Sequence, residues 1–211
     1  AVDARGNVYA GTSAGVWAYT AAGSRLWKSA DAHNVTERGG SLAIDQTNGV
    51  IFAALKGKKG VAAINMSDGS TKWTFASGYN DCYHPVVDVQ GTVYVNEKNG
   101  ALYAVTSAGA LKWKYDAGLG YTYSGFALGA DGHAYITQYA SPFAVLDIAP
   151  DGSASVLTNI AQTMSPVCIG PDARLYYGLN GSIGTINIGV QMAQGRWPCR
   201  GGNIHGTNSL K

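Results

Sequence analysis

The sequence predicts an all-β fold made of repeated units, and three observations support this prediction. An aromatic residue inside a short apolar segment recurs at intervals of 43, 42, 41 and 41 residues along the chain. Turn-forming residues precede each of these segments, and a second apolar segment follows each of them. The recurring aromatics are Tyr9, Phe52, Tyr94, Tyr135 and Tyr176. A period near 42 built from short strands is typical of a β-propeller, so we expect about five four-stranded blades.

The repeats divide the chain into one propeller domain, 1–211. The expected blades are roughly 1–30, 31–78, 79–118, 119–161 and 162–200, with a tail at 201–211. The first repeat begins partway through its inner strand, at 1–4, and the last has its outer strand near 191–197. We expect a closed ring of five blades; part of a larger ring and an assembly of two chains are the alternatives.

The third repeat shows the expected strands most plainly. They are an inner strand at 85–89, a second at 92–95, a third at 101–106 and an outer strand at 110–115. Apolar and polar residues alternate along the outer strand, as on a half-exposed edge. Helical spacing of apolar residues does not persist for two turns anywhere in the chain, so no helix is expected.

A tryptophan recurs on the outer strand of the repeats. It stands four residues after a glycine in the first three repeats, whereas the fourth has Val156 at this position. Trp197 lies 21 residues after Tyr176, as Trp73 lies 21 residues after Phe52. We expect these residues to pack between adjacent blades, with the indole N–H bound to a backbone group. The four tryptophans are Trp27, Trp73, Trp113 and Trp197.

Composition narrows the classes of function. Charged residues make up 13% of the chain and the net charge is +2 without a basic cluster, which disfavours nucleic acid and anionic membranes as partners. No run of 18 apolar residues exists, so no membrane span is expected. The chain does not start with Met, and we interpret it as a mature or trimmed product of an exported protein, extracellular or periplasmic.

Three cysteines, Cys82, Cys168 and Cys199, leave two alternatives open. In an oxidising compartment Cys168 and Cys199 could form a disulfide that ties the tail to the last blade. The other alternative is three separate thiols.

Three segments resemble the tryptophan-docking repeat of the PQQ-like (quinoprotein-type) β-propellers. They are 15–27, 60–73 and 100–113, and the Trp-Pro-Cys-Arg-Gly sequence at 197–201 is similar to a segment that often begins or ends such arrays. The resemblance covers the whole chain and implies a propeller. The family includes PQQ-dependent alcohol dehydrogenases and scaffolds similar to the propeller lipoprotein of the outer-membrane β-barrel assembly machinery.

The chain departs from those enzymes in three ways. It has about five repeats rather than eight, no adjacent cysteine pair, and no evident set of Glu, Asn and Asp for the Ca²⁺ that activates the quinone. We therefore expect the non-enzymatic branch and no cofactor, with PQQ and calcium as the alternative.

The segments that enter the inner strands are expected to meet at one mouth of the central channel, where ligands often bind. Asp81, Cys82 and His84 fall within four residues there. Four alternatives exist for this segment: a metal site at Cys82 and His84, a nucleophilic Cys–His pair, a polar lining of a water-filled channel, or a site for a small polar ligand. We expect neither metal nor catalytic residues. The candidate ligand-binding residues are Glu37, Arg38, Asp81, Cys82, His84, Tyr121, Tyr123 and Gln162. His133, beside a turn, is expected to be solvated.

These observations predict a non-catalytic binding or scaffold module for a protein or a small polar ligand such as a glycan. One alternative is a lectin-like carbohydrate binder that stacks sugars on Tyr121 and Tyr123. Another is a PQQ-dependent dehydrogenase or a fragment of one. A homo-oligomer is compatible with each of these functions.

Overall fold

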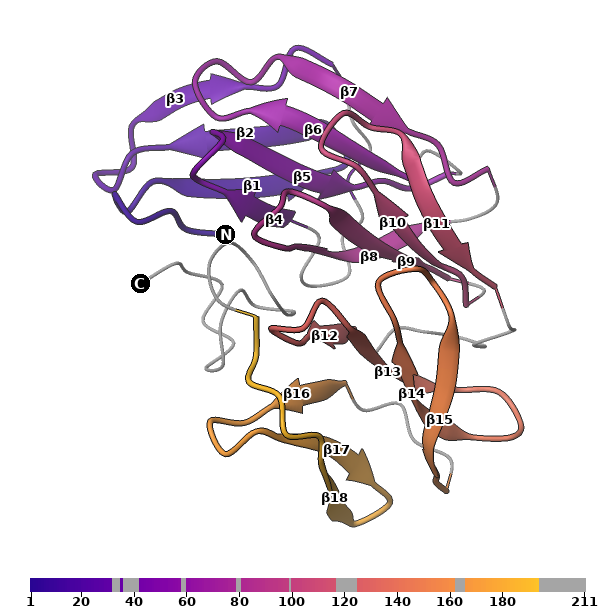
Figure 1. Ribbon diagram of the computed structural model, residues 1–211. Coiled ribbons are helices and arrows are strands. Elements are labelled where there is room, and N and C mark those ends of the chain that lie inside the picture. Colours follow the sequence, from indigo (N-terminus) through magenta and orange to yellow (C-terminus); the bar gives the residue numbers. More distant parts are fainter. Residues whose placement is uncertain are drawn as a thin grey trace.

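The computed structural model contains eighteen β-strands in five antiparallel sheets, fanned in chain order (Figure 1). The structure describes residues 1–31, 35, 42–57, 60–78, 81–98, 100–116, 125–161 and 166–193. Throughout these residues the ordered elements are strands, and no helix capable of crossing a membrane occurs among them. The prediction of an all-β propeller is confirmed.

The sheets follow the chain from inner to outer strand, and each pairs consecutive strands. The first sheet contains β1 (Val8–Thr12), β2 (Gly15–Tyr19) and β3 (Arg25–Lys28). The second contains β4 (Leu42–Asp45), β5 (Val50–Ala54), β6 (Val61–Asn65) and β7 (Thr71–Phe75). The third contains β8 (Cys82–Val87), β9 (Val93–Glu97), β10 (Leu102–Val105) and β11 (Leu111–Tyr115). The fourth contains β12 (Phe126–Leu128), β13 (Ala134–Gln138), β14 (Ala144–Ile148) and β15 (Ala154–Asn159). The fifth contains β16 (Val167–Ile169), β17 (Arg174–Leu179) and β18 (Ser182–Asn187).

The first and fifth sheets each have three strands among the described residues, not the four expected. In the first sheet the start of the chain supplies a fragment of the inner strand. Val2 bridges Val8, the N-terminal amine donates to the carbonyl of Tyr9 (2.9 Å), and the N–H of Tyr9 donates to Ala1 (2.8 Å). Ala1 and Val2 thus occupy the inner-strand position of the first sheet.

The expected outer strand of the last blade is wrong for residues 191–193. Met192 instead bridges Gly129 next to β12, and the N–H of Ala193 donates to the carbonyl of Leu128 (2.8 Å). The inner edge of β12 offers free ladder groups, and pairing there buries Met192 and Ala193 against the fourth and fifth sheets. Residues 194–197 lie outside the described part.

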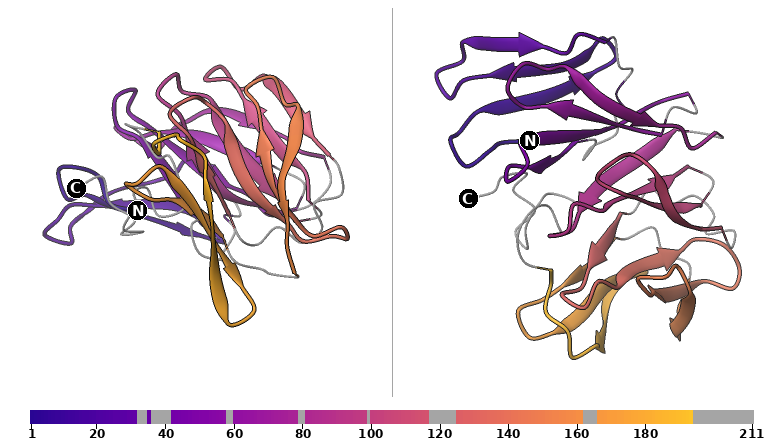
Figure 2. Two further views of the ribbon diagram at one scale, coloured as in Figure 1. Left: turned by 60° about the horizontal axis from the view of Figure 1, so that its bottom comes forward. Right: turned by 45° about the horizontal axis from the view of Figure 1, so that its top comes forward.

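Successive sheets lie side by side (Figure 2), and the buried side chains of the core lie between them. One hydrophobic cluster joins the first three sheets, a second joins the third and fourth, and a third joins the fourth and fifth. Every residue of β4, β5, β8 and β9 is buried. A closed ring requires the first and fifth sheets to pack together, and none of these clusters of described residues includes both. The described sheets therefore form an arc.

Tryptophans on three outer strands link neighbouring sheets. Each indole N–H donates to a carbonyl in the hairpin between the third and fourth strands of the next sheet. These bonds run from Trp27 to Met66 (2.8 Å), from Trp73 to Ser107 (2.9 Å) and from Trp113 to Pro150 (2.9 Å). Each indole also contacts the recurring aromatic of its own sheet. The ring centroids are 5.9 Å apart for Tyr9 and Trp27, and 5.8 Å for both Phe52–Trp73 and Tyr94–Trp113.

Candidate functional site

A polar cluster surrounds the start of β8, where the sequence places three candidate ligand-binding residues. Asp81 lies just before the strand, and its Oδ1 accepts a hydrogen bond from the N–H of Gly57 in the second sheet (2.8 Å). Its backbone carbonyl accepts the N–H of Lys98 (3.0 Å), and its Oδ2 lies 3.5 Å from the hydroxyl of Tyr83. Asp81 thus connects the second and third sheets by a hydrogen bond near the start of β8.

Cys82 is buried between the second and third sheets. Its N–H donates to the carbonyl of Leu55 (3.1 Å), and its side chain is fully shielded from solvent. Burial raises the pKa of the Cys82 thiol to about 12. The thiol is therefore protonated at neutral pH, and thiolate chemistry requires the opposite shift.

His84 lies in a β-bulge that interrupts the pairing of β8 with β9 between Tyr83 and Val86. Its φ is +50°, a left-handed conformation that is uncommon outside glycine. The imidazole is buried, with its centroid 6.1 Å from the ring of Tyr83. In a regular strand, Cys82 and His84 would face the same side of the sheet. The bulge after Tyr83 interrupts this alternation, so the two side chains do not have that relation.

Glu97 and Tyr103 extend this cluster, and the sequence analysis missed them. Glu97 ends β9 and is only 2% exposed; its Oε2 accepts the hydroxyl of Tyr103 (3.2 Å). That hydroxyl also lies 3.4 Å from the carbonyl of Ser77. Burial and the nearby Glu97 carboxylate raise the pKa of Tyr103. Glu97 falls between the strands expected at 92–95 and 101–106, so nothing local in the sequence indicated its burial.

The remaining channel-mouth candidates, Glu37, Arg38, Tyr121, Tyr123 and Gln162, lie outside the described residues. Among the residues that the structure describes, no group of three His, Cys, Asp or Glu side chains is placed to hold a metal ion. The channel-mouth site as a whole stays a prediction.

Three grooves open at the opposite ends of the inner strands, one at each of the first three interfaces between sheets. Their volumes are about 600 Å³ between the first and second sheets, 310 Å³ between the second and third, and 410 Å³ between the third and fourth. Equivalent positions line all three, namely the turn after the inner strand, the recurring aromatic and the outer strand. Each groove also contains one basic residue, and these are Arg5, Lys72 and Lys112.

The aspartate at or just after the end of the inner strand in each groove accepts internal hydrogen bonds; these residues are Asp3, Asp45 and Asp88. Asp88 accepts the N–H groups of Gln90 (2.9 Å) and Thr92 (2.8 Å), and its Oδ2 accepts the hydroxyl of Tyr94 (3.1 Å). Asp3 binds Tyr9 and the 5–7 turn in the same way. Burial, together with the carboxylate, raises the pKa of both Tyr9 and Tyr94. These carboxylates stabilise turns, and so does Asp131, which also lines the third groove, whereas the basic side chains are exposed.

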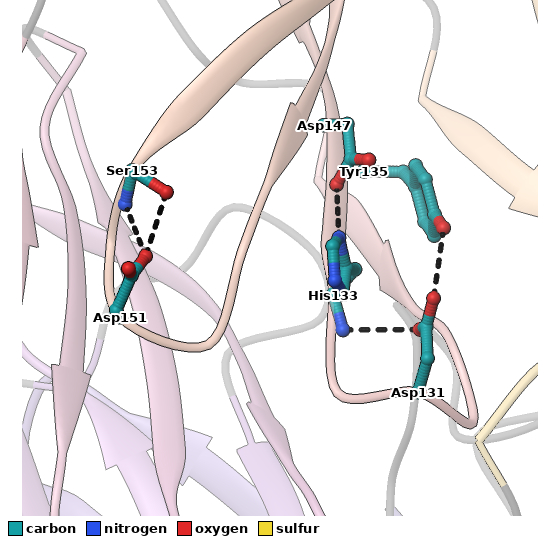
Figure 3. Close-up of polar contacts among 6 residues, drawn as sticks. All are labelled: Asp131, His133, Tyr135, Asp147, Asp151 and Ser153. Atoms are coloured by element: carbon teal, nitrogen blue, oxygen red, sulfur yellow. Dashed lines mark hydrogen bonds and ion pairs between the residues drawn. The ribbon is translucent and has the colours of Figure 1, made fainter.

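The fourth sheet carries a histidine–carboxylate pair (Figure 3). His133 Nδ1 lies 2.6 Å from Asp147 Oδ1, and the histidine side chain is 31% exposed. The backbone N–H of His133 donates to Asp131 (3.1 Å), whose other oxygen lies 3.5 Å from the hydroxyl of Tyr135. The expectation of a solvated His133 is therefore wrong: the side chain is partly buried and has a carboxylate partner. The pair bridges β14 and the start of β13.

Comparison with solved structures agrees with this architecture. The chain is similar to the computationally designed Ika8 protein (TM-score 0.67, 10% identity, covering 86% of this chain and 55% of that one). It is equally similar to BamB from Moraxella catarrhalis (TM-score 0.67, 17% identity, 87% and 55%). It also matches the WD40 β-propeller domain of Doa1 (TM-score 0.62, 15% identity, 89% and 60%). The chain thus spans about half the length of the first two structures. No family model and no curated protein matches the sequence.

Fold, topology and these similarities together define the class of this protein: it is a β-propeller built from short antiparallel sheets. At these identities the similarity establishes the fold alone, and membership of the PQQ-like family remains a prediction.

Proposed function

We propose that this protein is a non-catalytic binding module that holds an extended, acidic segment of a partner protein in the grooves between its blades. The observation that carries this proposal is the recurrence of one groove, at equivalent positions, at three successive interfaces. A row of similar grooves matches a ligand that is itself extended, since each groove can take one part of it.

The charge of the grooves indicates the chemistry of the partner. Arg5, Lys72 and Lys112 are exposed, whereas Asp3 and Asp88 are engaged in turns. Carboxylates spaced along the partner would therefore meet one cation in each groove. Such rim charges act mainly on association rate and specificity.

A selection from a library of random peptides tests this function. We expect acidic peptides to be enriched, and their Kd to rise about tenfold when Lys72 and Lys112 are both changed to Glu. Lys98→Glu is the matched control, because Lys98 lies at the opposite ends of the inner strands, beside Asp81. Enriched peptides that are neutral or basic, or binding that survives the double reversal, would contradict the proposal.

The absence of catalysis is part of the proposal. It is supported by the buried, protonated thiol of Cys82 and by the departures of the sequence from the quinoprotein enzymes. We propose that no cofactor is required. Reconstitution with PQQ and Ca²⁺ followed by a dye-reduction assay checks this, and quinone absorbance that stays with the protein after gel filtration would contradict it.

Export to the periplasm or the cell exterior belongs to the same proposal, and cell fractionation tests it.

Carbohydrate binding at Tyr121 and Tyr123 remains the alternative from the sequence. A glycan array that gives signals lost on changing both tyrosines to Ala would favour this alternative over protein binding.

A further inference from the structure

An asparagine that is followed by a glycine can convert to aspartate without an enzyme, and this chain contains three such pairs. They are Asn48–Gly49, Asn99–Gly100 and Asn180–Gly181. Because glycine has no Cβ, its backbone nitrogen can reach the side-chain carbonyl carbon of the asparagine before it. The local sequence is equally favourable at the three pairs, so only the fold distinguishes them.

The reaction makes two demands on the local structure. The glycine nitrogen gives its proton to a base and forms a bond to Cγ of the asparagine, and the side-chain nitrogen takes up a proton and leaves as ammonia. Water then opens the succinimide ring at either carbonyl, which yields aspartate, or isoaspartate with its main chain running through Cβ and Cγ. The glycine N–H must therefore be free of an acceptor, and the asparagine amide must be free to turn toward it.

Hydrogen bonds hold both reacting groups of the Asn48–Gly49 pair. Asn48 Nδ2 donates to Asp45 Oδ2 (2.8 Å), and the backbone N–H of Asn48 donates to Asp45 Oδ1 (3.1 Å). The N–H of Gly49 donates to the carbonyl of Gln46 (3.3 Å). Asn48 is nevertheless exposed, so any protection at this pair comes from these hydrogen bonds and not from exclusion of water.

The Asn99–Gly100 pair has a similar restraint on its glycine. The N–H of Gly100 donates to the carbonyl of Glu97 (2.9 Å). Asn99 lies outside the described residues, so this pair serves only as a reference in the unfolded chain.

The Asn180–Gly181 pair differs in both respects. It forms the turn between β17 and β18 in the last sheet of the arc (Figure 1), where Leu179 pairs with Ser182. Both residues of the pair are exposed, and nothing in the described part of the chain lies within 4 Å of a Cβ added at Gly181. Among the described residues, neither the Asn180 side chain nor the Gly181 N–H has a hydrogen-bond partner. The nucleophile and the amide that it attacks are therefore both available.

We propose that Asn180 is a site of spontaneous deamidation in the folded protein, whereas the fold protects Asn48. Either product replaces a neutral amide by a carboxylate, which lowers the net charge of the chain by one. Isoaspartate also adds a main-chain carbon to the turn, so the pairing of Leu179 with Ser182 no longer fits. The modification does not involve the grooves and is independent of the proposed binding function.

Peptide mapping by mass spectrometry of the purified full chain, incubated at mildly alkaline pH, tests this proposal. The conversion of each Asn–Gly peptide is followed in native buffer and in urea. In urea the three peptides should convert at similar rates, because they share the same reacting pair. In native buffer Asn48 should convert more slowly than Asn180 by about tenfold or more, because its hydrogen bonds must first open.

Asn180→Gln is the matched control variant, because the longer side chain would have to close a six-membered ring, which forms far more slowly. It should abolish the conversion of this peptide and leave the rate at Asn48 unchanged. Equal native rates at Asn180 and Asn48 would overturn the proposal. Asn180 also stands in an Asn-Gly-Ser glycosylation sequence. A glycan on Asn180 in protein purified from its natural source would overturn the proposal as well, because the substituted nitrogen cannot leave as ammonia.

Discussion

At the scale of single residues, the position of the outer-strand tryptophan has different roles in different blades. Trp113 is 8% exposed and donates to Pro150, whereas Val156, at the same spacing in the fourth blade, is 57% exposed. The two residues share their spacing from the hairpin glycine but not their strand register, because Trp113 pairs with Ala104, the partner of Tyr94, whereas Val156 pairs with Leu146. The spacing alone does not show this difference.

Trp113→Ala should lower the free energy of unfolding by about 3–5 kcal/mol, because it removes a buried ring and its hydrogen bond to the next sheet. Val156→Ala is the matched control and should change it by less than about 0.5 kcal/mol. Urea denaturation followed by circular dichroism measures both. Equal effects of the two substitutions would show that Trp113 does not link the sheets.

The cysteines should differ in reactivity. Cys168 is exposed, whereas Cys82 is buried with its pKa raised to about 12, so the comparison is made on the reduced protein. At pH 8 we expect iodoacetamide to modify Cys168 in the native protein and Cys82 only after unfolding. Peptide mapping by mass spectrometry locates the label. Fast native labelling of Cys82 would mean that this part of the second interface opens readily. Cys199 lies outside the described residues, so the choice between a disulfide and separate thiols stays open there.

At the scale of elements, the hairpin glycines determine how closely adjacent sheets approach. Gly109 has a φ of +85°, and a Cβ on it would lie 2.8 Å from Trp73 Cδ2. Gly78 has a similar φ of +88° with nothing within 4 Å of an added Cβ. The two glycines thus share backbone strain and differ in packing.

Gly109→Ala should therefore cost about 1–3 kcal/mol more than Gly78→Ala, since both introduce the same left-handed strain and only the first also overpacks an interface. The difference between the two unfolding free energies is the quantity to measure. A difference near zero would mean that the hairpin of the third sheet moves away from Trp73 without cost.

Strand pairing also shows where local sequence patterns lose their predictive value. The third repeat gave its four strands in the correct order because alternating apolar residues and Gly-containing turns encode strands locally. Residues 191–193 were assigned to the wrong sheet, since their pairing with the inner edge of β12 depends on which edge is open in space. Glu97 lies between two expected strands, and its burial follows from its contact with Tyr103 on the neighbouring strand.

At the scale of the whole molecule, buried phenols should make the protein sensitive to alkaline pH. Burial, reinforced by a neighbouring carboxylate, raises the pKa of four tyrosines: Tyr9, Tyr94, Tyr103 and Tyr135. The folded state keeps these protons after the unfolded chain has begun to lose them. The stabilisation is therefore complete below the unfolded pKa of about 10 and is lost as pH rises above it.

We expect the free energy of unfolding to be flat near neutral pH and to fall slightly above about pH 8.5, where Cys82 ionises in the unfolded chain only. It should fall steeply above about pH 10, where the tyrosines do the same. Urea titrations at a series of pH values measure it. Tyr94→Phe should reduce the steepness of the fall more than Tyr176→Phe, because Tyr94 is buried, whereas the half-buried Tyr176 has its pKa raised mainly by its hydrogen bond to Asp172. Stability that rises above pH 10 would show that these phenols are not held protonated by the fold.

The sequence predicted part of the candidate site and missed the rest. The sequence placed Asp81, Cys82 and His84 together because they are adjacent in the chain, but it could not show that Cys82 is shielded or that a bulge turns His84. The grooves were not predicted at all. Each is assembled from a turn, a strand and a hairpin that lie tens of residues apart, and no local pattern encodes such a surface.

The sequence by itself determined the all-β class, the number of repeats and the positions of the aromatic and tryptophan residues, because period-2 alternation and turn chemistry are local properties of the chain. The tertiary structure alone decided which faces are covered: the arc formed by the described sheets, the tryptophan contacts between neighbouring sheets, and the grooves. These depend on how one sheet packs on the next, and packing is set by contacts between residues that the chain order keeps far apart.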